Sequence, residues 1–290
     1  MWSSLNRCGI VGGVNAALAE RPAPGVGPRA GTAREAVLIR SAVALAALVA
    51  LGLLAWFVLR TGTGQRLDDG AMSTVVAGRD TRLTVLSLLG RVSIGAIVVV
   101  AIACVVLALV QGRLAAAAAA LTVLVGANVT TQVLKHGVLE RVDGFVQAPN
   151  SFPSGHTTVV VAGVAALLLA APRVVRPLVV LAGTFAGTLT GASTVVAGWH
   201  RPADVVGSVL VVLVWAAAAS LLLGGRTDRS LSAWPSALVG AAAAGLTLVA
   251  IGVRPSYGWS GFGEAAVVLT VVAAATAVGV ALVQRVAPGR

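Results

Sequence analysis

The sequence predicts an all-α protein built as a polytopic bundle of transmembrane helices, and three observations lead to this prediction. Of its 290 residues, 58% are hydrophobic and only 11% are charged. The mean hydropathy of +0.95 exceeds that of ordinary soluble domains. The apolar residues gather in runs close to the ~20 residues that cross a hydrocarbon core. In lipid, the backbone of such runs satisfies its own hydrogen bonds only as a helix.

Eight apolar stretches approach the length of a membrane span, and the fourth is the shortest. They cover residues 36–59, 92–111, 114–134, 156–171, 177–198, 203–224, 234–253 and 263–283. We expect the first six to form a core domain over 36–224 and the last two to add a pair of helices over 225–290. Residues 1–35 contain no continuous apolar run, so we interpret them as a disordered cytoplasmic tail and not as a secretory signal.

The net charge of +11 is spread between the apolar runs, which favours a role in membrane topology over nucleic-acid binding. If the N-terminal tail is cytoplasmic, the inner side holds Arg7, Arg21, Arg29, Arg34, Arg113, Arg173, Arg176, Arg226, Arg229, Arg285 and Arg290. The long segment 61–91 then lies outside, and its amphipathic stretch 80–89 forms either a surface helix or a plain loop. We expect an integral protein of the bacterial cell membrane.

The fifth span carries glycines at every fourth position, which places small residues on one helix face. They are Gly183, Gly187 and Gly191. Such a face lets a neighbouring helix approach closely.

The third span ends in a polar stripe. Asn128, Gln132 and Lys135 stand at positions i, i+4 and i+7, and Lys135 is the single lysine of the chain. Polar groups at membrane depth usually face a wet cavity. For Asn128 and Gln132, an inter-helix hydrogen bond is an equally good explanation.

The chain's three histidines, His136, His156 and His200, lie in or beside two loops. The first loop, 135–156, joins the third and fourth spans, and the second, 193–204, joins the fifth and sixth. Because two spans separate the loops, both emerge on the same side of the membrane. Two cysteines, one in the tail and one in an apolar run, offer no disulfide framework or metal site.

The residue types of these loops suit a phosphate group. A phosphate monoester carries nearly two negative charges, so its site needs cations and N–H donors. Lys135 and Arg141 supply cations. The sequence Pro-Ser-Gly-His at 153–156 leads into the fourth span, so it places the amides of Ser154 and Gly155 at a helix N-terminus, which favours an anion.

Together the motifs resemble those of the type-2 phosphatidic acid phosphatase and vanadium haloperoxidase superfamily. That pattern is a Lys and an Arg across a loop, then Pro-Ser-Gly-His, then Ser-Arg, five residues, His, three residues and Asp. Pro-Ser-Gly-His is complete at 153–156, and Ser193, His200 and Asp204 keep the family's spacing. The three motifs occur in the family's order on alternating spans.

The sequence departs from that pattern at three positions. Five residues separate Lys135 from Arg141 where the family often has six, and Val142 replaces a proline. Thr194 occupies the position of the family's second arginine, and a threonine hydroxyl provides one neutral donor and no charge. Arg201, beside His200, is the nearest cation that could compensate.

The resemblance implies catalytic roles for three residues. His200 is the nucleophile that forms a phosphohistidine, Asp204 fixes its tautomer, and His156 protonates the departing alkoxide. The substrate-binding residues are Lys135, Arg141, Ser154, Gly155, Ser193, Thr194 and Arg201. We interpret His136, Glu140 and Asp143 as surface residues.

The resemblance implies an integral membrane phosphatase that acts at the extracytoplasmic face on phosphatidic acid, phosphatidylglycerol phosphate, or a polyprenyl phosphate or diphosphate. We expect its partners to be the bilayer and the lipid substrate, with no nucleic acid, no metal and no cofactor. Two alternatives remain: a phosphotransferase of the same superfamily, and a non-catalytic lipid-phosphate-binding or transport protein, which Thr194 favours. The related haloperoxidases are disfavoured because they are soluble.

Overall fold

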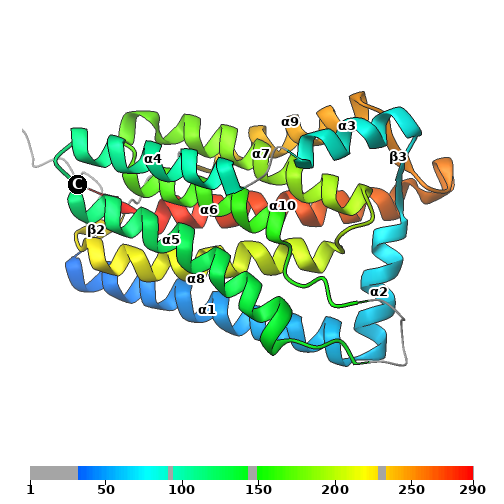
Figure 1. Cartoon of the computed structure of the whole chain (residues 1–290), viewed down its shortest axis with the longest axis horizontal. Helices are drawn as coiled ribbons and strands as arrows, with labels where there is room; N and C mark the ends of the chain where they lie inside the picture. The colour runs from blue at the N-terminus through cyan, green and yellow to red at the C-terminus, as the bar shows by residue number, and fades with distance from the viewer. Residues whose placement is uncertain (1–31, 91–93, 143–148, 228–232, 290) are drawn as a thin grey trace, which may run out of the picture. The chain divides into compact units, whose positions relative to one another are not determined.

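The computed structural model describes residues 32–90, 94–142, 149–227 and 233–289, and these ranges form ten α-helices (Figure 1). Eight correspond to the predicted spans. They are α1 (Ala33–Arg60), α4 (Ile94–Val110), α5 (Leu114–Val133), α6 (Gly155–Ala170), α7 (Arg176–Val196), α8 (Pro202–Leu223), α9 (Ala233–Ala250) and α10 (Phe262–Val286). The all-α prediction is therefore confirmed. Most of the predicted tail, residues 1–31, lies outside the described residues.

Six helical segments of the described ranges are long and apolar enough to cross a membrane. They contain α1, α5, α7, α8, α9 and α10. The helix α6 is shorter, with 16 residues, as the sequence indicated. Helix α4 meets the same criterion only together with α3 (Arg79–Gly90), from which it is bent by 49°.

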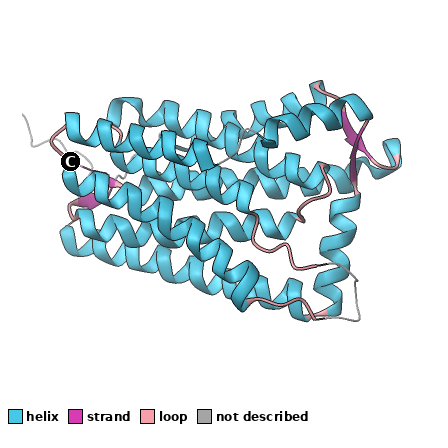
Figure 2. Ribbon diagram, in the orientation of Figure 1, coloured by secondary structure: helices cyan, strands magenta, loops and turns pink. Residues whose placement is uncertain are grey.

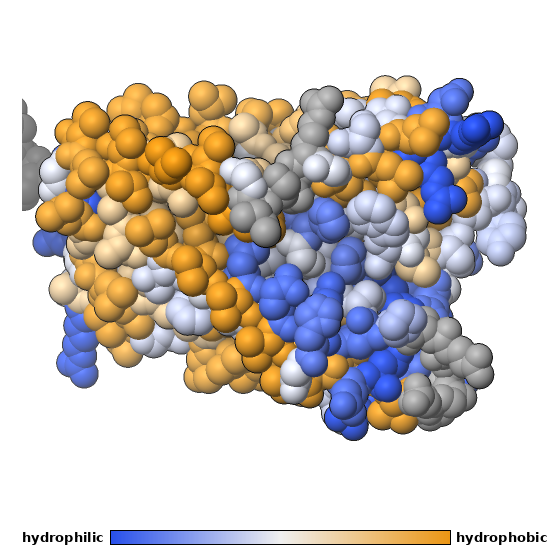
Figure 3. Space-filling model, viewed as in Figure 1, coloured by the Kyte–Doolittle hydropathy of each residue, from blue (hydrophilic) through white to orange (hydrophobic). Residues whose placement is uncertain are grey.

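The outer surface of these helices is apolar. Large hydrophobic side chains such as Trp56, Leu178 and Val267 are more than half exposed, which in water would be unfavourable over so wide a surface. In Figure 3 hydrophobic residues cover much of the visible face, and hydrophilic residues gather toward its right half. Together, the apolar surface and the helix lengths identify an integral membrane protein.

Close helix packing confirms the role predicted for the glycines of α7. A Cβ atom on Gly187 would lie 2.7 Å from the side chain of Thr276 in α10, and one on Gly191 would lie 2.7 Å from Val205 in α8. A Cβ on Gly183 would collide with Val164 of α6. The three glycines therefore let α6, α8 and α10 approach α7. Helix α10 also packs against α9, so the last two helices join the core helices.

Residues 61–90, the described part of segment 61–91, form more secondary structure than the sequence indicated. They contain α2 (Gly62–Ser73), strand β1 (Val75–Ala77) and α3. The helical reading of 80–89 is confirmed; α3 buries Val85 and Leu89, and the helix packs against α7. Strand β1 pairs antiparallel with β3 (Val253–Pro255), and β2 (Arg226–Thr227) pairs with β4 (Pro288–Gly289) at the other end of the bundle (Figure 2).

Arginines cap helix ends at the β2–β4 end of the bundle. Arg40 donates to the carbonyl of Val286, Arg113 to that of Ala170, and Arg176 to that of Pro288. Helix α6 begins at the opposite end, where α5 and α7 finish. The two loops of the sequence motifs therefore lie at the opposite end from these arginines.

Candidate phosphate-handling site

Helix ends bring the predicted motifs together. Helix α5 finishes in a π-helical turn (Leu134–Val138) that carries Lys135, α6 begins directly after Ser154, and α8 begins directly after Arg201. The N–H of Ser154 donates to the carbonyl oxygen of Asp204 over 3.0 Å, so a backbone hydrogen bond joins the two loops. This contact fixes the start of α6 against the start of α8.

A cavity of about 760 Å³ opens at this junction. Four of its lining residues are predicted site residues: Lys135, Gly155, His156 and His200. Its wall also includes Asn128 and Gln132, so the polar stripe of α5 faces the cavity, which was one of the two explanations left open. Asn128 donates to the carbonyl of Leu124 one turn back in its own helix, and this bond replaces the inter-helix bond that was the alternative.

The side chain of Asp204 holds the His200 ring. Nδ1 of His200 lies 3.1 Å from Oδ2 of Asp204, and both side chains are buried. In the tautomer with the proton on Nδ1, the Nδ1–H group donates a hydrogen bond to the carboxylate, and Nε2 keeps its lone pair. The arrangement therefore provides an imidazole with one nitrogen fixed and the other available in the cavity.

The same carboxylate oxygen of Asp204 accepts two further hydrogen bonds. The N–H of Arg201 donates over 3.0 Å and the hydroxyl of Ser151 over 2.6 Å. Such bonds stabilise the ionised form of a carboxylate. The role of Ser151 was not predicted, although its place two residues before Pro153 of the Pro-Ser-Gly-His motif was a usable signal.

The backbone of the second loop is shaped by Gly198, whose φ of +74° favours glycine. The turn lets the N–H groups of Trp199 and His200 donate to the carbonyl of Thr194. The hydroxyl of Thr194 donates to the carbonyl of Gly191 over 2.7 Å and is fully buried. Thr194 thus fixes the backbone of His200, and its hydroxyl is already in use within α7.

His156 is placed by ring contacts with the second loop. Its ring centroid lies 5.4 Å from that of Trp199 and 6.5 Å from that of His200. The two histidines therefore line the same cavity with their rings in edge contact. Trp199, which the sequence analysis left without a role, positions His156.

The N-terminus of α6 differs in part from the prediction that the amides of Ser154 and Gly155 are both free to bind an anion. The N–H of Ser154 is occupied by Asp204, and its hydroxyl caps α6 by accepting from the N–H of Thr157. Gly155 lines the cavity, and within the described ranges its amide has no hydrogen-bond partner. One of the two predicted backbone donors is therefore available to an anion, because the other closes the loop contact.

Packing behind the motif keeps it rigid. Phe152 is fully buried against Gly207 of α8, where any side chain would collide with the phenyl ring. The hydroxyl of Ser208 lies 2.7 Å from the carbonyl oxygen of Ser154 and 2.8 Å from that of Asp204. Both polar and apolar contacts from α8 therefore hold the start of α6.

Two adjacent carboxylates on α2 were missed by the sequence analysis. Asp69 forms an ion pair with Nε of Arg201, and its Oδ1 lies 3.8 Å from Nη1 of Arg141. Arg201 also donates from Nη1 to Ser151 over 2.9 Å. Asp68 accepts the N–H of Ala203 at the start of α8. Their adjacency in a chain with ten acidic residues was the available signal.

Burial alters the titration of the charged groups around α2. Desolvation, and next the nearby charge of Asp204, raises the pKa of Asp68 to about 7. Burial lowers the pKa of Arg141, and the positive charge of Arg201 lowers it further. Both arginines are buried, and neither lines the 760 Å³ cavity. The cation in the cavity wall is Lys135.

One further predicted binding residue, Ser193, and the predicted surface residues complete the comparison. Ser193 is fully buried, and its hydroxyl has no partner within the described ranges. His136 and Glu140 are exposed, in agreement with their interpretation as surface residues, whereas Asp143 lies outside the described residues. Within the described ranges, His, Cys, Asp and Glu side chains form no group of three or more that could hold a metal ion.

Fold and site together define a class: a helical integral membrane protein with a buried histidine-carboxylate pair facing a second histidine and a lysine. Comparison with protein-family models narrows this class. Residues 116–228, from α5 to the strand after α8, match the model of the PAP2 superfamily. This match supports membership of the type-2 phosphatidic acid phosphatase superfamily and points to activity of the phosphatase type. Neither the curated proteins nor the solved structures contain a match to the chain.

Proposed function

We propose that this protein hydrolyses a membrane lipid phosphate or diphosphate through a phosphohistidine intermediate on His200, at the extracytoplasmic face. The observation that carries the proposal is the His200–Asp204 contact of 3.1 Å beside a cavity that also contains His156 and Lys135. A nucleophile, its orienting group, a second acid-base group and a cation thus meet at one place.

In the first step, Nε2 of His200 attacks the phosphorus atom and the ester P–O bond breaks. The proton that the lipid alkoxide needs comes from His156, and the products are the lipid alcohol and a phosphohistidine. Asp204 stabilises the positive charge that develops on the His200 ring, because its ionised carboxylate accepts a hydrogen bond from Nδ1–H.

In the second step, water attacks the phosphorus atom and the N–P bond breaks. His156, now neutral, takes the proton from the water, so the enzyme returns to its starting state as inorganic phosphate leaves. The two steps use the same group as acid and then as base.

Charge stabilisation comes from several directions. Lys135 and the Gly155 amide contact the phosphoryl oxygens, and Arg141 and Arg201 contribute positive potential from behind the cavity wall. Ser154 and Thr194 act by shaping the two loops, because their hydroxyls and the amide of Ser154 are engaged. Arg201 replaces part of the charge that Thr194 lacks.

The location of the site supports a lipid substrate. Its cavity lies at one end of the helix bundle, beside helices whose outer faces are apolar, so a substrate can keep its tail in the bilayer while its phosphate reaches His200. An apolar tail joined to a phosphate group is common to phosphatidic acid, phosphatidylglycerol phosphate and polyprenyl phosphates. The arginines at the opposite end of the bundle favour an extracytoplasmic site.

The test is phosphate release by the purified protein from these lipid phosphates in mixed micelles, with His200→Ala as the paired variant. We expect release by the wild type and none above background by the variant. Transfer of the phosphoryl group to an added lipid alcohol, with little free phosphate, would instead identify a phosphotransferase. Equal rates for the two proteins would refute the phosphohistidine route.

One set of observations favours the second candidate, a lipid-phosphate-binding protein without turnover. Thr194 provides no charge, and Asp69 neutralises part of the charge of Arg141 and Arg201. In that case the wild type would bind the lipid phosphates without releasing phosphate. The same assay, combined with a measurement of binding, separates the two functions.

A further inference from the structure

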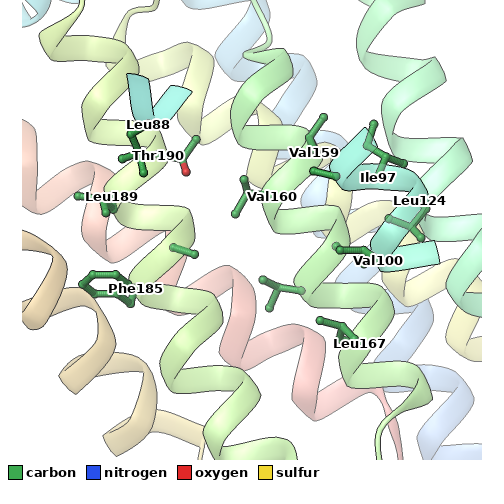
Figure 4. A pocket seen from close by; sticks show the side chains of 14 residues that line it. Leu88, Ile97, Val100, Leu124, Val159, Val160, Leu167, Phe185, Leu189 and Thr190 are labelled. Carbon is green, nitrogen blue, oxygen red and sulfur yellow. The ribbon is translucent and has the colours of Figure 1, made fainter. Parts of the chain in front are cut away.

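A second pocket, of about 400 Å³, lies deeper in the bundle and is almost entirely apolar (Figure 4). Side chains from α4, α6 and α7 form most of its wall, with Leu88 of α3 at one side. The wall contains no charged residue. Most of the lining side chains are half-buried, so the pocket is open toward the outside of the bundle.

The apolar pocket adjoins the histidine cavity. Ile97 of α4 and Val159 of α6 line both spaces, and Val159 stands one turn after Gly155 and three residues after His156. A molecule whose phosphate lies beside His200 therefore meets the mouth of the apolar pocket next.

The depth of the pocket matches one leaflet. Its wall on α6 runs from Val159 to Leu167, a rise of about 12 Å at 1.5 Å per residue. Half of a hydrocarbon core is roughly 15 Å thick. On α7 the wall runs from Thr190, near the site, to Phe185. The pocket thus extends from the headgroup level toward the middle of the bilayer.

We propose that this pocket binds one hydrocarbon chain of the lipid phosphate, and the inference rests on the proposed function of the histidine cavity. A volume of 400 Å³ lies near the low end of ligand pockets, which suits a single chain and not two side by side. The protein therefore recognises its substrate by one chain in a preformed groove, and any second chain stays in the surrounding lipid.

The test uses a single-chain alkylphosphonate with a diazirine at the end of its chain, in phosphatidylcholine vesicles that contain the full-length protein. A phosphonate is not hydrolysed, so labelling does not depend on turnover. We expect mass spectrometry to find the photolabel in segments 159–167 and 185–190. Ala186→Leu, which places bulk in the pocket, should lower this labelling about tenfold, since displacing roughly two methylenes corresponds to that factor.

Ala182→Leu is the matched control, because Ala182 is exposed one turn away on the same helix and does not line the pocket. Ala182→Leu should be photolabelled in these segments to the same extent as the wild type. If Ala186→Leu fails to fold, Ala96→Leu fills the pocket from α4 and should give the same loss.

If the filled-pocket variant, Ala186→Leu or Ala96→Leu, is photolabelled as strongly as the wild type, the proposal is overturned. Equal labelling by a diazirine alcohol of the same chain length would also overturn it, because the occupant would then be ordinary lipid. Labelling as expected, without phosphate release from any lipid phosphate by the wild type, would support the chain-binding pocket and refute the proposed hydrolysis.

Discussion

At the scale of single residues, His200 and Asp204 divide the chemistry between them. One forms the bond to phosphorus in the proposed reaction, and the other holds the ring through a 3.1 Å contact. We predict that His200→Ala abolishes turnover, whereas Asp204→Asn leaves a residual rate, lower than that of the wild type by roughly 10²- to 10⁴-fold. The measurement is kcat with a lipid phosphate, on protein shown to be folded by its thermal transition.

Asp204 also accepts bonds from Arg201 and Ser151, so its loss disturbs the loop as well as the ring. Ser151→Ala is a control for that contribution, because it removes one of these bonds and keeps the carboxylate. We expect Ser151→Ala to lower kcat far less than Asp204→Asn does. An equal loss in both variants would show that loop structure, and not the state of the imidazole, sets the rate.

Asp69 tunes the charge of the site. Its carboxylate pairs with Arg201 and lies near Arg141, so it offsets positive charge behind the cavity. We predict that Asp69→Asn tightens the binding of inorganic phosphate roughly 2- to 10-fold, because one nearby negative charge is removed while a hydrogen-bond acceptor remains. Isothermal titration or competitive inhibition measures the effect, and Asp80→Asn on α3 is the exposed control. Weaker binding in Asp69→Asn would mean that the carboxylate chiefly positions the arginines.

At the scale of elements, α2 matters because it docks on the start of α8 through a buried acid. Asp68 accepts the N–H of Ala203, and its pKa is raised from 3.8 to about 7 by burial and by the charge of Asp204. The folded protein therefore holds this proton more tightly than the unfolded chain. The stability that the neutral carboxyl contributes is fully present below about pH 3.8 and is lost as the pH rises through about 7.

Asp68→Asn removes this titration. We predict that the Tm of the variant, relative to the wild type, is higher at pH 8.5 than at pH 5.5 by roughly 2–4 °C. Scanning calorimetry at both pH values measures the difference. The same comparison with Asp80→Asn should show no such change, because the Asp80 side chain is exposed. A difference of opposite sign would mean that Asp68 is charged and paired in the folded protein.

At the scale of the whole molecule, the spans were predictable because a bilayer imposes one length and one hydrogen-bonding rule on every crossing segment. All eight predicted spans are helices, and even the short length of α6 was visible in the sequence. The segment 61–91 was not predictable in detail. Its helix α2 is polar and its strand β1 pairs with β3, about 180 residues later, so no local pattern reports the contact.

The structure brings several of the predicted site residues together and adds residues that were not predicted. His156, His200 and Lys135 share one cavity, because their motifs start or end helices at the same end of the bundle. Asp68 and Asp69 were missed because they act from a helix outside the motifs, through contacts over more than 130 residues of chain. The engaged amide of Ser154 was also invisible, since it depends on the position of the Asp204 carbonyl.

The orientation of the whole bundle is a separate prediction. In a cysteine-free variant, Val138→Cys lies beside Lys135 and Val174→Cys lies at the opposite end of the bundle; both valines are more than half exposed. We predict that an impermeant maleimide labels Val138→Cys in intact cells and Val174→Cys only after permeabilisation. The reverse pattern would place the site in the cytoplasm.

The most direct test of the account is to trap the phosphorylated protein. The purified protein is mixed with a lipid phosphate labelled in its phosphoryl group, quenched within the first turnover and digested for mass spectrometry under alkaline conditions. The account predicts an acid-labile phosphoryl group on His200, which accumulates in wild type and is absent from His200→Ala. Release of phosphate without any such intermediate, or a phosphoryl group on another residue, would contradict it.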